Sequence, residues 1–121
     1  MAAEDSRLRV LRTDGVIRVE FVDRNILDEA NIQVIGEELS SLIEAEVNPR
    51  LLISFANVDH LSSAALGTLI TINNKIRNKD GQLRLADIDP QIYEVFVITK
   101  LNRIFEIHDT SDEAMTSFAV A

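Results

Sequence analysis

Two adjacent serines, Ser62 and Ser63, are the side chains best placed for chemistry in this sequence. They separate a polar stretch, 57–60, from a segment whose apolar residues recur at helical spacing, so both are expected where a helix begins. The first N–H groups of a helix have no internal partner, and a serine hydroxyl commonly caps them. A phosphate there would meet the same donors and would add a charge of about −1.5 to −2. From the residues alone, capping is the commoner role and phosphorylation the alternative.

No other group of side chains predicts a reactive centre. The chain has no cysteine and two histidines that are far apart in sequence, and His60 is expected to be a solvated loop residue. Gly67 stands alone and predicts no phosphate-binding loop. Four aspartates fall in expected loops and helix starts, where this residue caps or turns the chain: Asp87, Asp89, Asp109 and Asp112. The sequence therefore predicts no metal site, no cofactor and no enzyme activity.

Length and charge narrow the kind of partner. The 121 residues fit one domain, 1–121, with 1–6 as a flexible N-terminus. The net charge of −8 and the pI near 4.6 argue against binding to nucleic acid. Neither an export signal nor a membrane-spanning run is present, so the cytoplasm is the expected compartment. A protein or a small molecule is the expected partner.

The elements that position the two serines begin with a hairpin. Apolar runs flank Asp14-Gly15, which suits a two-residue hairpin loop and predicts antiparallel neighbours. An amphipathic helix is expected over about 28–46, ended by Asn48-Pro49. The continuous apolar run 51–55 is typical of a central strand that is covered on both faces.

Helices and parallel strands alternate in the second half. The helix that starts at the two serines should end at Asp80-Gly81, with the glycine in a left-handed conformation, and a strand should follow at 83–86. The next helix begins at Pro90, with Ile92, Val95 and Phe96 on one face. A short strand over 101–107 precedes a last helix that Thr110 and Glu113 cap. The predicted fold is α/β, a mixed sheet of four to five strands with about four helices.

The sequence resembles the STAS domain family, of the anti-sigma factor antagonist type. The most specific segment is Ser62-Ser63-Ala64-Ala65-Leu66-Gly67, where Ser63 takes the place of the family's phosphoacceptor and Ser62 is the runner-up. Ser62 stands where the family usually has Asp, and Ala65 where it usually has Gly. Later residues also fall on the family's pattern: Gly81-Gln82-Leu83, Pro90, Val95-Phe96, Thr99, Leu101, Phe105-Glu106-Ile107 and Ala114.

The resemblance implies a partner switch. The unphosphorylated domain would bind an anti-sigma factor of the histidine-kinase-like ATPase class, and phosphorylation of Ser63 would separate the two. ATP and magnesium would belong to that kinase, and a serine phosphatase could reverse the step. The surface for the partner would consist of the helix start and the preceding loop: Asn57, Val58, Asp59, His60, Ser62, Ser63, Ala64, Leu66 and Gly67.

Three alternatives remain open at this point. The domain could be a STAS scaffold that is never phosphorylated, which the serine at position 62 favours. It could be a sensor of a small ligand, for which no dedicated residues are evident. An exposed edge of the mixed sheet could also support a homodimer.

Overall fold

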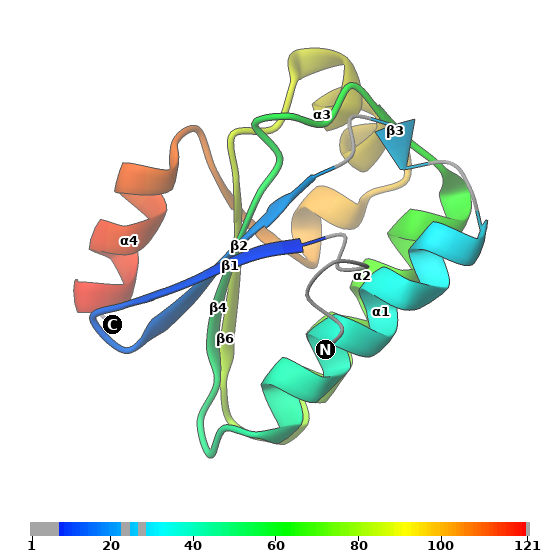
Figure 1. Cartoon of the computed structure of the whole chain (residues 1–121). Coiled ribbons are helices and arrows are strands. Elements are labelled where there is room, and N and C mark those ends of the chain that lie inside the picture. The colour runs from blue at the N-terminus through cyan, green and yellow to red at the C-terminus, as the bar shows by residue number, and fades with distance from the viewer. Residues whose placement is uncertain (1–7, 23–24, 27–28, 121) are drawn as a thin grey trace.

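The structure, a computed structural model, describes residues 8–22, 25–26 and 29–120. The predicted flexible N-terminus, 1–6, lies outside the described residues. Five strands form the central sheet in the order β1-β2-β4-β6-β7 (Figure 1). Their bounds are Leu8–Thr13 (β1), Val16–Phe21 (β2), Arg50–Ser54 (β4), Gln82–Ala86 (β6) and Glu106–His108 (β7). The pair β1–β2 is antiparallel and the other neighbours are parallel, as predicted.

The described residues form four α-helices. They are α1 (Glu29–Glu44), α2 (Ser63–Asn78), α3 (Pro90–Ile98) and α4 (Ser111–Val120). The helices α1 and α2 lie on one face and α4 lies on the other (Figure 1). The predicted fold class, an α/β domain with a mixed sheet of four to five strands and about four helices, is therefore confirmed, with five strands in the central sheet. None of the described helices is both long and apolar enough to cross a membrane.

The central strand β4 contributes to a core on each face of the sheet. Leu51 and Ile53 point into the cluster beneath α1 and α2, and Leu52 joins Ala114 and Phe118 of α4 on the opposite face. All three β4 side chains are fully buried, which confirms the predicted central strand. Because β4 is packed on both faces, its end is held firmly in place. The loop that leads from β4 to α2 therefore starts from a well-packed part of the core.

The hairpin loop has the predicted geometry. Asp14 and Gly15 have φ values of +54° and +79°, and Thr13 pairs with Val16 directly before and after them. Positive φ at both central residues matches the twist of the two strands.

The turn after α2 differs from the prediction. Asp80, not Gly81, takes the left-handed conformation, with φ at +56°. Gly81 is needed for another reason, because a Cβ at this position would lie 2.2 Å from the carbonyl oxygen of Pro49. The close approach brings the end of α2 against the start of β4.

The predicted strand over 101–107 is wrong in its first half. Lys100 ends α3 with φ at +63°, and a 3-10 turn, Leu101–Arg103, follows it. The strand β7 is limited to the three residues Glu106–His108. Leu101 and Phe105 are apolar because they fill the core, so their apolar character reflects burial and does not require a strand.

The apolar face of α3 is narrower than predicted. Ile92 and Phe96 are buried, whereas Val95 is 36% exposed. The start of α3 is as predicted, since Asp89 accepts a hydrogen bond of 2.8 Å from the N–H of Gln91 and Pro90 follows it.

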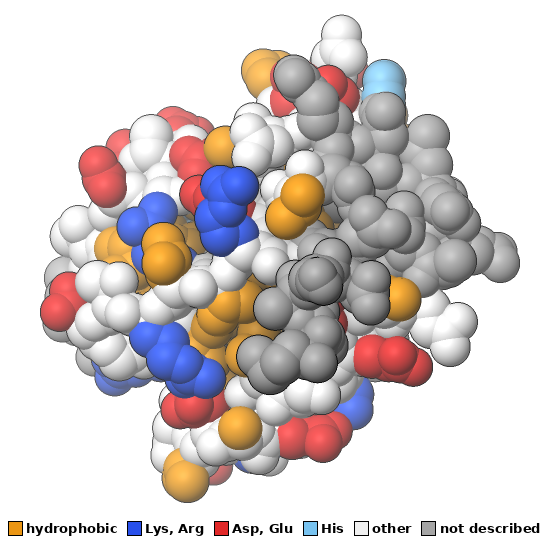
Figure 2. Space-filling view, in the orientation of Figure 1, with side chains coloured by type: hydrophobic (Ala, Val, Ile, Leu, Met, Phe, Trp, Pro, Cys, Tyr) orange, Lys and Arg blue, Asp and Glu red, His pale blue; other side chains and the backbone are white. Residues whose placement is uncertain are grey.

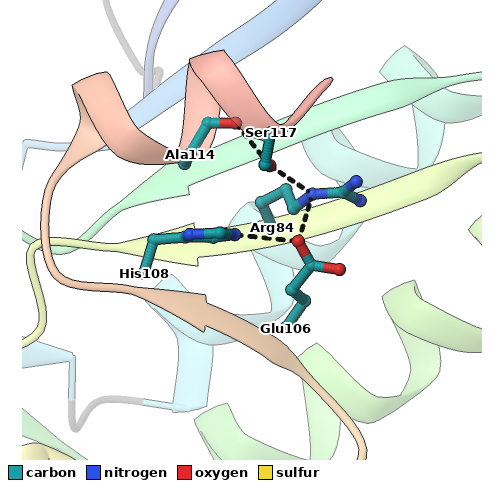
Figure 3. Close-up of polar contacts among 5 residues, drawn as sticks. All are labelled: Arg84, Glu106, His108, Ala114 and Ser117. Atoms are coloured by element: carbon teal, nitrogen blue, oxygen red, sulfur yellow. Dashed lines mark hydrogen bonds and ion pairs between the residues drawn. The ribbon is translucent and has the colours of Figure 1, made fainter. Parts of the chain in front are cut away.

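A polar cluster holds α4 on its face of the sheet (Figure 3). The buried Arg84 of β6 places Nε 2.8 Å from the Ser117 hydroxyl and 2.6 Å from Glu106 Oε2. Its guanidinium also lies 4.5 Å above the ring centre of Phe118. Glu106 Oε2 is in turn 2.8 Å from Nε2 of His108. This cluster joins α4, β6 and β7 and belongs to the framework of the fold.

Candidate functional site

The start of α2 gives its two serines different environments. Ser62 is the N-cap, half-buried, and its hydroxyl accepts a hydrogen bond of 3.2 Å from the N–H of Ala65. Ser63 is the first helical residue and is exposed. No hydrogen bond of its hydroxyl is found within the described part of the chain. One hydroxyl is thus occupied by the helix end, and its neighbour is accessible to a partner.

Backbone hydrogen bonds and buried side chains hold the loop before α2 in place. Phe55 donates its N–H to the carbonyl of Ala86 at 2.9 Å, and Val58 donates to the carbonyl of Phe55 at 3.0 Å. Both side chains are buried. The last two loop residues form a short strand, β5 (His60–Leu61), that pairs in parallel with β3 (Asn25–Ile26). Sequence reasoning missed this small second sheet, because two-residue strands leave no periodic pattern.

Two residues of the predicted docking surface are buried, so their assignment to that surface is wrong. Val58 is 2% exposed and Leu66 is 6% exposed, so both belong to the core. Val58 of the loop and Leu66 of α2 are both part of the main hydrophobic core, which holds the loop and the helix against the domain. The exposed members are Asn57, Asp59, His60, Ser63, Ala64 and Gly67. The functional role of these exposed residues stays a prediction.

A shallow hollow extends this surface toward α3. It is lined by Asp59, His60, Leu61, Gln91, Ile92 and Val95. Sequence reasoning missed Gln91 and Val95, since they lie some thirty positions further along the chain. A signal was present: α3 is apolar at more positions than one buried face requires, and Val97 and Ile98 are 45% and 78% exposed. Of the exposed apolar side chains of α3, Val95 lies at the hollow beside the loop that precedes the two serines.

The electrostatics at the start of α2 favour an anion. The first turn of α2 contains no acidic residue, so the partial positive charge of the helix end is not neutralised by the helix itself. The first two helical residues, Ser63 and Ala64, are exposed and have small side chains, whereas the N–H of Ala65 is already bonded to Ser62. Within the described residues, no three His, Asp or Glu side chains are grouped closely enough to hold a metal ion.

A second serine at a helix start lies on the other side of the sheet. Ser111 is the first residue of α4, and the preceding Thr110 accepts a hydrogen bond of 3.1 Å from the N–H of Glu113. Asp87 accepts from the N–H of Ser111 at 3.2 Å and from its hydroxyl, and also from the Ser54 hydroxyl at 2.7 Å. Asp87, expected only to cap or turn the chain, therefore ties the ends of β4 and β6 to α4.

The chain belongs to the STAS domain family, whose sequence model matches residues 8–114. A relative in Bordetella bronchiseptica, BtrV, is itself proposed to be an anti-sigma factor antagonist. It is 24% identical over 98 residues, which cover 81% of this chain and 84% of BtrV. The resemblance inferred from the residues is thus confirmed at the level of the family.

Solved structures share the fold. An anti-sigma-factor antagonist (STAS) domain protein from Planctomyces limnophilus has a TM-score of 0.84 and 21% identity, covering 93% of this chain and 97% of that one. The anti-sigma factor antagonist SpoIIAA, in its unphosphorylated form, has a TM-score of 0.68 and 14% identity, with 94% and 98% covered. The phosphorylated form of Bacillus SpoIIAA also has a TM-score of 0.68, with 16% identity and 92% and 98% covered.

Proposed function

We infer that this domain is an anti-sigma factor antagonist that acts in a partner switch, with Ser63 as the regulated residue. In its unphosphorylated form it binds an anti-sigma factor that is also a serine kinase, and the sigma factor is released. Phosphorylation of Ser63 then separates the complex, and a serine phosphatase restores the first state. The domain supplies no catalytic group in this cycle, because the kinase binds ATP and magnesium. The cytoplasm is the compartment in which such a switch would work.

The observation that carries this proposal is the accessible hydroxyl of Ser63. It belongs to the first helical residue, it is exposed, and the cap of the helix is made by Ser62 instead. A kinase can therefore modify Ser63 without removing a hydrogen bond that the fold needs.

The proposed docking surface consists of the exposed side chains on both sides of the hollow. Asn57, Asp59 and His60 lie on the loop, and Gln91 and Val95 lie on α3. Val95 and the half-buried Leu61 give this area an apolar part among polar side chains, and a polar rim around an apolar centre is typical of transient interfaces. A partner that covers the hollow would also reach Ser63 at the adjacent helix start.

The effect of the phosphate would be electrostatic. It would add about two negative charges at the start of α2, where the backbone N–H groups and the helix dipole stabilise an anion. The fold would be retained, which is supported by the equal TM-scores of 0.68 for SpoIIAA with and without phosphate. The added charge would change only what a partner meets at this surface, on a chain whose net charge is already −8.

The second candidate is a scaffold that binds its partner permanently. Ser62 favours it, because the family usually has Asp at this position. Serine and aspartate cap a helix about equally well, so the replacement keeps the cap and removes one negative charge beside Ser63. A kinase that depends on this charge would bind the domain without modifying it.

The test is a phosphorylation reaction with the cognate kinase and ATP, followed by mass spectrometry. Wild type should carry one phosphate on Ser63, and Ser63→Ala should carry none. The matched variant is Ser62→Asp, which keeps a capping oxygen but removes the neighbouring hydroxyl, and it should still be phosphorylated. Binding should be measured before and after the reaction, and phosphorylation should weaken it at least about tenfold.

Two results would contradict the proposal. Phosphate that persists in Ser63→Ala and disappears in Ser62→Asp would identify Ser62 as the acceptor. Tight binding to the kinase without any phosphate on wild type would support the scaffold.

A further inference from the structure

The strand β1 is one edge of the central sheet. It pairs with β2 on one side, and on its other side no strand of the described residues pairs with it. In Figure 1 it crosses the front of the domain, and Figure 2 shows hydrophobic side chains next to Lys or Arg side chains over the same area. Leu11 is 54% exposed and Val10 is 37% exposed. They lie on opposite faces of the strand, so the edge offers apolar surface on both sides.

The hairpin geometry determines which backbone groups point outward. A two-residue loop makes its flanking residues, Thr13 and Val16, a hydrogen-bonded pair. Hydrogen-bonded and non-hydrogen-bonded pairs alternate along an antiparallel ladder. Leu11 and Arg9 therefore direct their N–H and C=O groups to β2, whereas Val10 and Arg12 direct theirs away from the sheet.

The usual protections against edge pairing are weak in β1. Its pairing with β2 runs without a bulge from Leu8 to Thr13, and it contains no proline. Its two charged side chains are neutralised within the chain. Arg9 lies 3.5 Å from Glu20, and Arg12 lies 2.8 Å from Glu46 of the loop after α1. A strand that approaches this edge would meet little net charge.

We propose that β1 is a self-association edge, at which a second copy of this chain adds its own β1 in antiparallel orientation with Leu11 on the two-fold axis. Val10 then pairs with Arg12 of the second copy, so the outward N–H and C=O groups of Val10 and Arg12 are satisfied in both strands. Arg9 faces Thr13 of the second copy, and no arginine faces another. Leu11 faces its equivalent, where the side chains of a non-hydrogen-bonded pair come close together.

This pattern fits a second copy better than an unrelated strand. The antiparallel two-fold arrangement places an apolar residue opposite itself and each arginine opposite a smaller or apolar side chain. The contact is small, so the dimer belongs to the weak and reversible class and should form between about 10 µM and about 1 mM. The association does not depend on the partner switch, and its test requires no kinase.

The first test is sedimentation equilibrium over this concentration range. Wild type should show a monomer–dimer equilibrium, and Leu11→Lys should raise the dissociation constant at least about tenfold, because two cations would face each other at the axis. The matched control is Val47→Lys, which adds the same charge at a side chain that is 83% exposed in the loop between α1 and β4. It should leave the equilibrium unchanged. Wild type that stays monomeric, or a dimer insensitive to Leu11→Lys, would overturn the proposal.

The second test determines the register. The chain has no cysteine, so single-cysteine variants cross-link only at the introduced site. Leu11→Cys should form an intermolecular disulfide on mild oxidation, because directly opposed Cα atoms of a non-hydrogen-bonded pair are about 4.5 Å apart, within disulfide range. Val10→Cys and Val47→Cys should form it at least about tenfold more slowly, because their equivalents are farther apart. Equal rates in all three variants would reject this register.

Discussion

Two helices of this domain begin with the same local arrangement, and only one of them presents its first serine to solvent. In α2, Ser62 accepts from the N–H three residues ahead and Ser63 follows it; in α4, Thr110 does the same and Ser111 follows it. Ser111 is held by the Asp87 carboxylate and is half-buried, whereas Ser63 is exposed. Thus the cap is a local property, but the accessibility of the next hydroxyl depends on what the rest of the chain places beside it.

The largest effect is expected at Asp87. Asp87→Ala should lower the free energy of unfolding by about 3 kcal/mol, because it removes the acceptor of three hydrogen bonds and places alanine at a left-handed position, with φ at +61°. Asp87→Asn tolerates this backbone and keeps one acceptor oxygen, so it should lose less than half as much. Urea unfolding measures both. A loss below about 1 kcal/mol in Asp87→Ala would show that α4 is held elsewhere.

The next largest effect compares the same substitution at the two helix starts. Ser111→Asp would put a second carboxylate against Asp87 and should cost about 2 kcal/mol. Ser63→Asp meets only solvent and the positive helix end, and it should raise stability by about 0.5 kcal/mol. The difference between the two variants, measured by thermal unfolding, tests the contrast directly. Equal changes at the two sites would mean that the environments do not differ as described.

A smaller effect is expected from the cap of α2. Ser62→Ala should lower the free energy of unfolding by about 1 kcal/mol, because the N–H of Ala65 loses its acceptor. Ser62→Asp should keep wild-type stability within about 0.5 kcal/mol, since aspartate caps as well as serine does. If both variants lost the same stability, the hydroxyl of Ser62 would have a role other than capping.

The smallest effect is expected at Ser63. Ser63→Ala should change the free energy of unfolding by less than about 0.5 kcal/mol, as for most exposed sites without partners. Ser111→Ala, its counterpart in α4, should cost about 1.5 kcal/mol through the lost hydrogen bond to Asp87. Hydrogen exchange at the first turn of each helix provides an independent measurement. A substantial loss in Ser63→Ala would show that this hydroxyl already has a structural partner.

Patterns within one element were predictable. The hairpin at Asp14-Gly15, the buried strand β4 and the starts of α2, α3 and α4 all follow from turn chemistry, periodicity and capping. The wrong predictions of secondary structure concern apolar residues that are buried by contacts with distant parts of the chain. Leu101 lies in a 3-10 turn and Phe105 lies just before β7, and both fill the core. The spacing of such apolar residues cannot distinguish a buried turn from a short strand.

Some residues of the candidate site were also predictable from local patterns, and others were not. Ser62 and Ser63 were located from the sequence, because helix starts have local signals. Val58 and Leu66 were assigned to the surface, although the loop and the helix use them as anchors in the core. Gln91 and Val95, which complete the hollow, come from a helix that only the fold brings to the loop.

The sequence is sufficient to identify the family, the order of the main helices and strands, and the position of a serine pair at a helix start. These features depend on residues that are close together along the chain. Which helix-start serine is bound and which is accessible depends on the fold, because Asp87 reaches Ser111 across 24 positions and no described group reaches the hydroxyl of Ser63. Among the described strands the fold also pairs β1 with β2 alone, since the neighbours of a strand come from other parts of the chain.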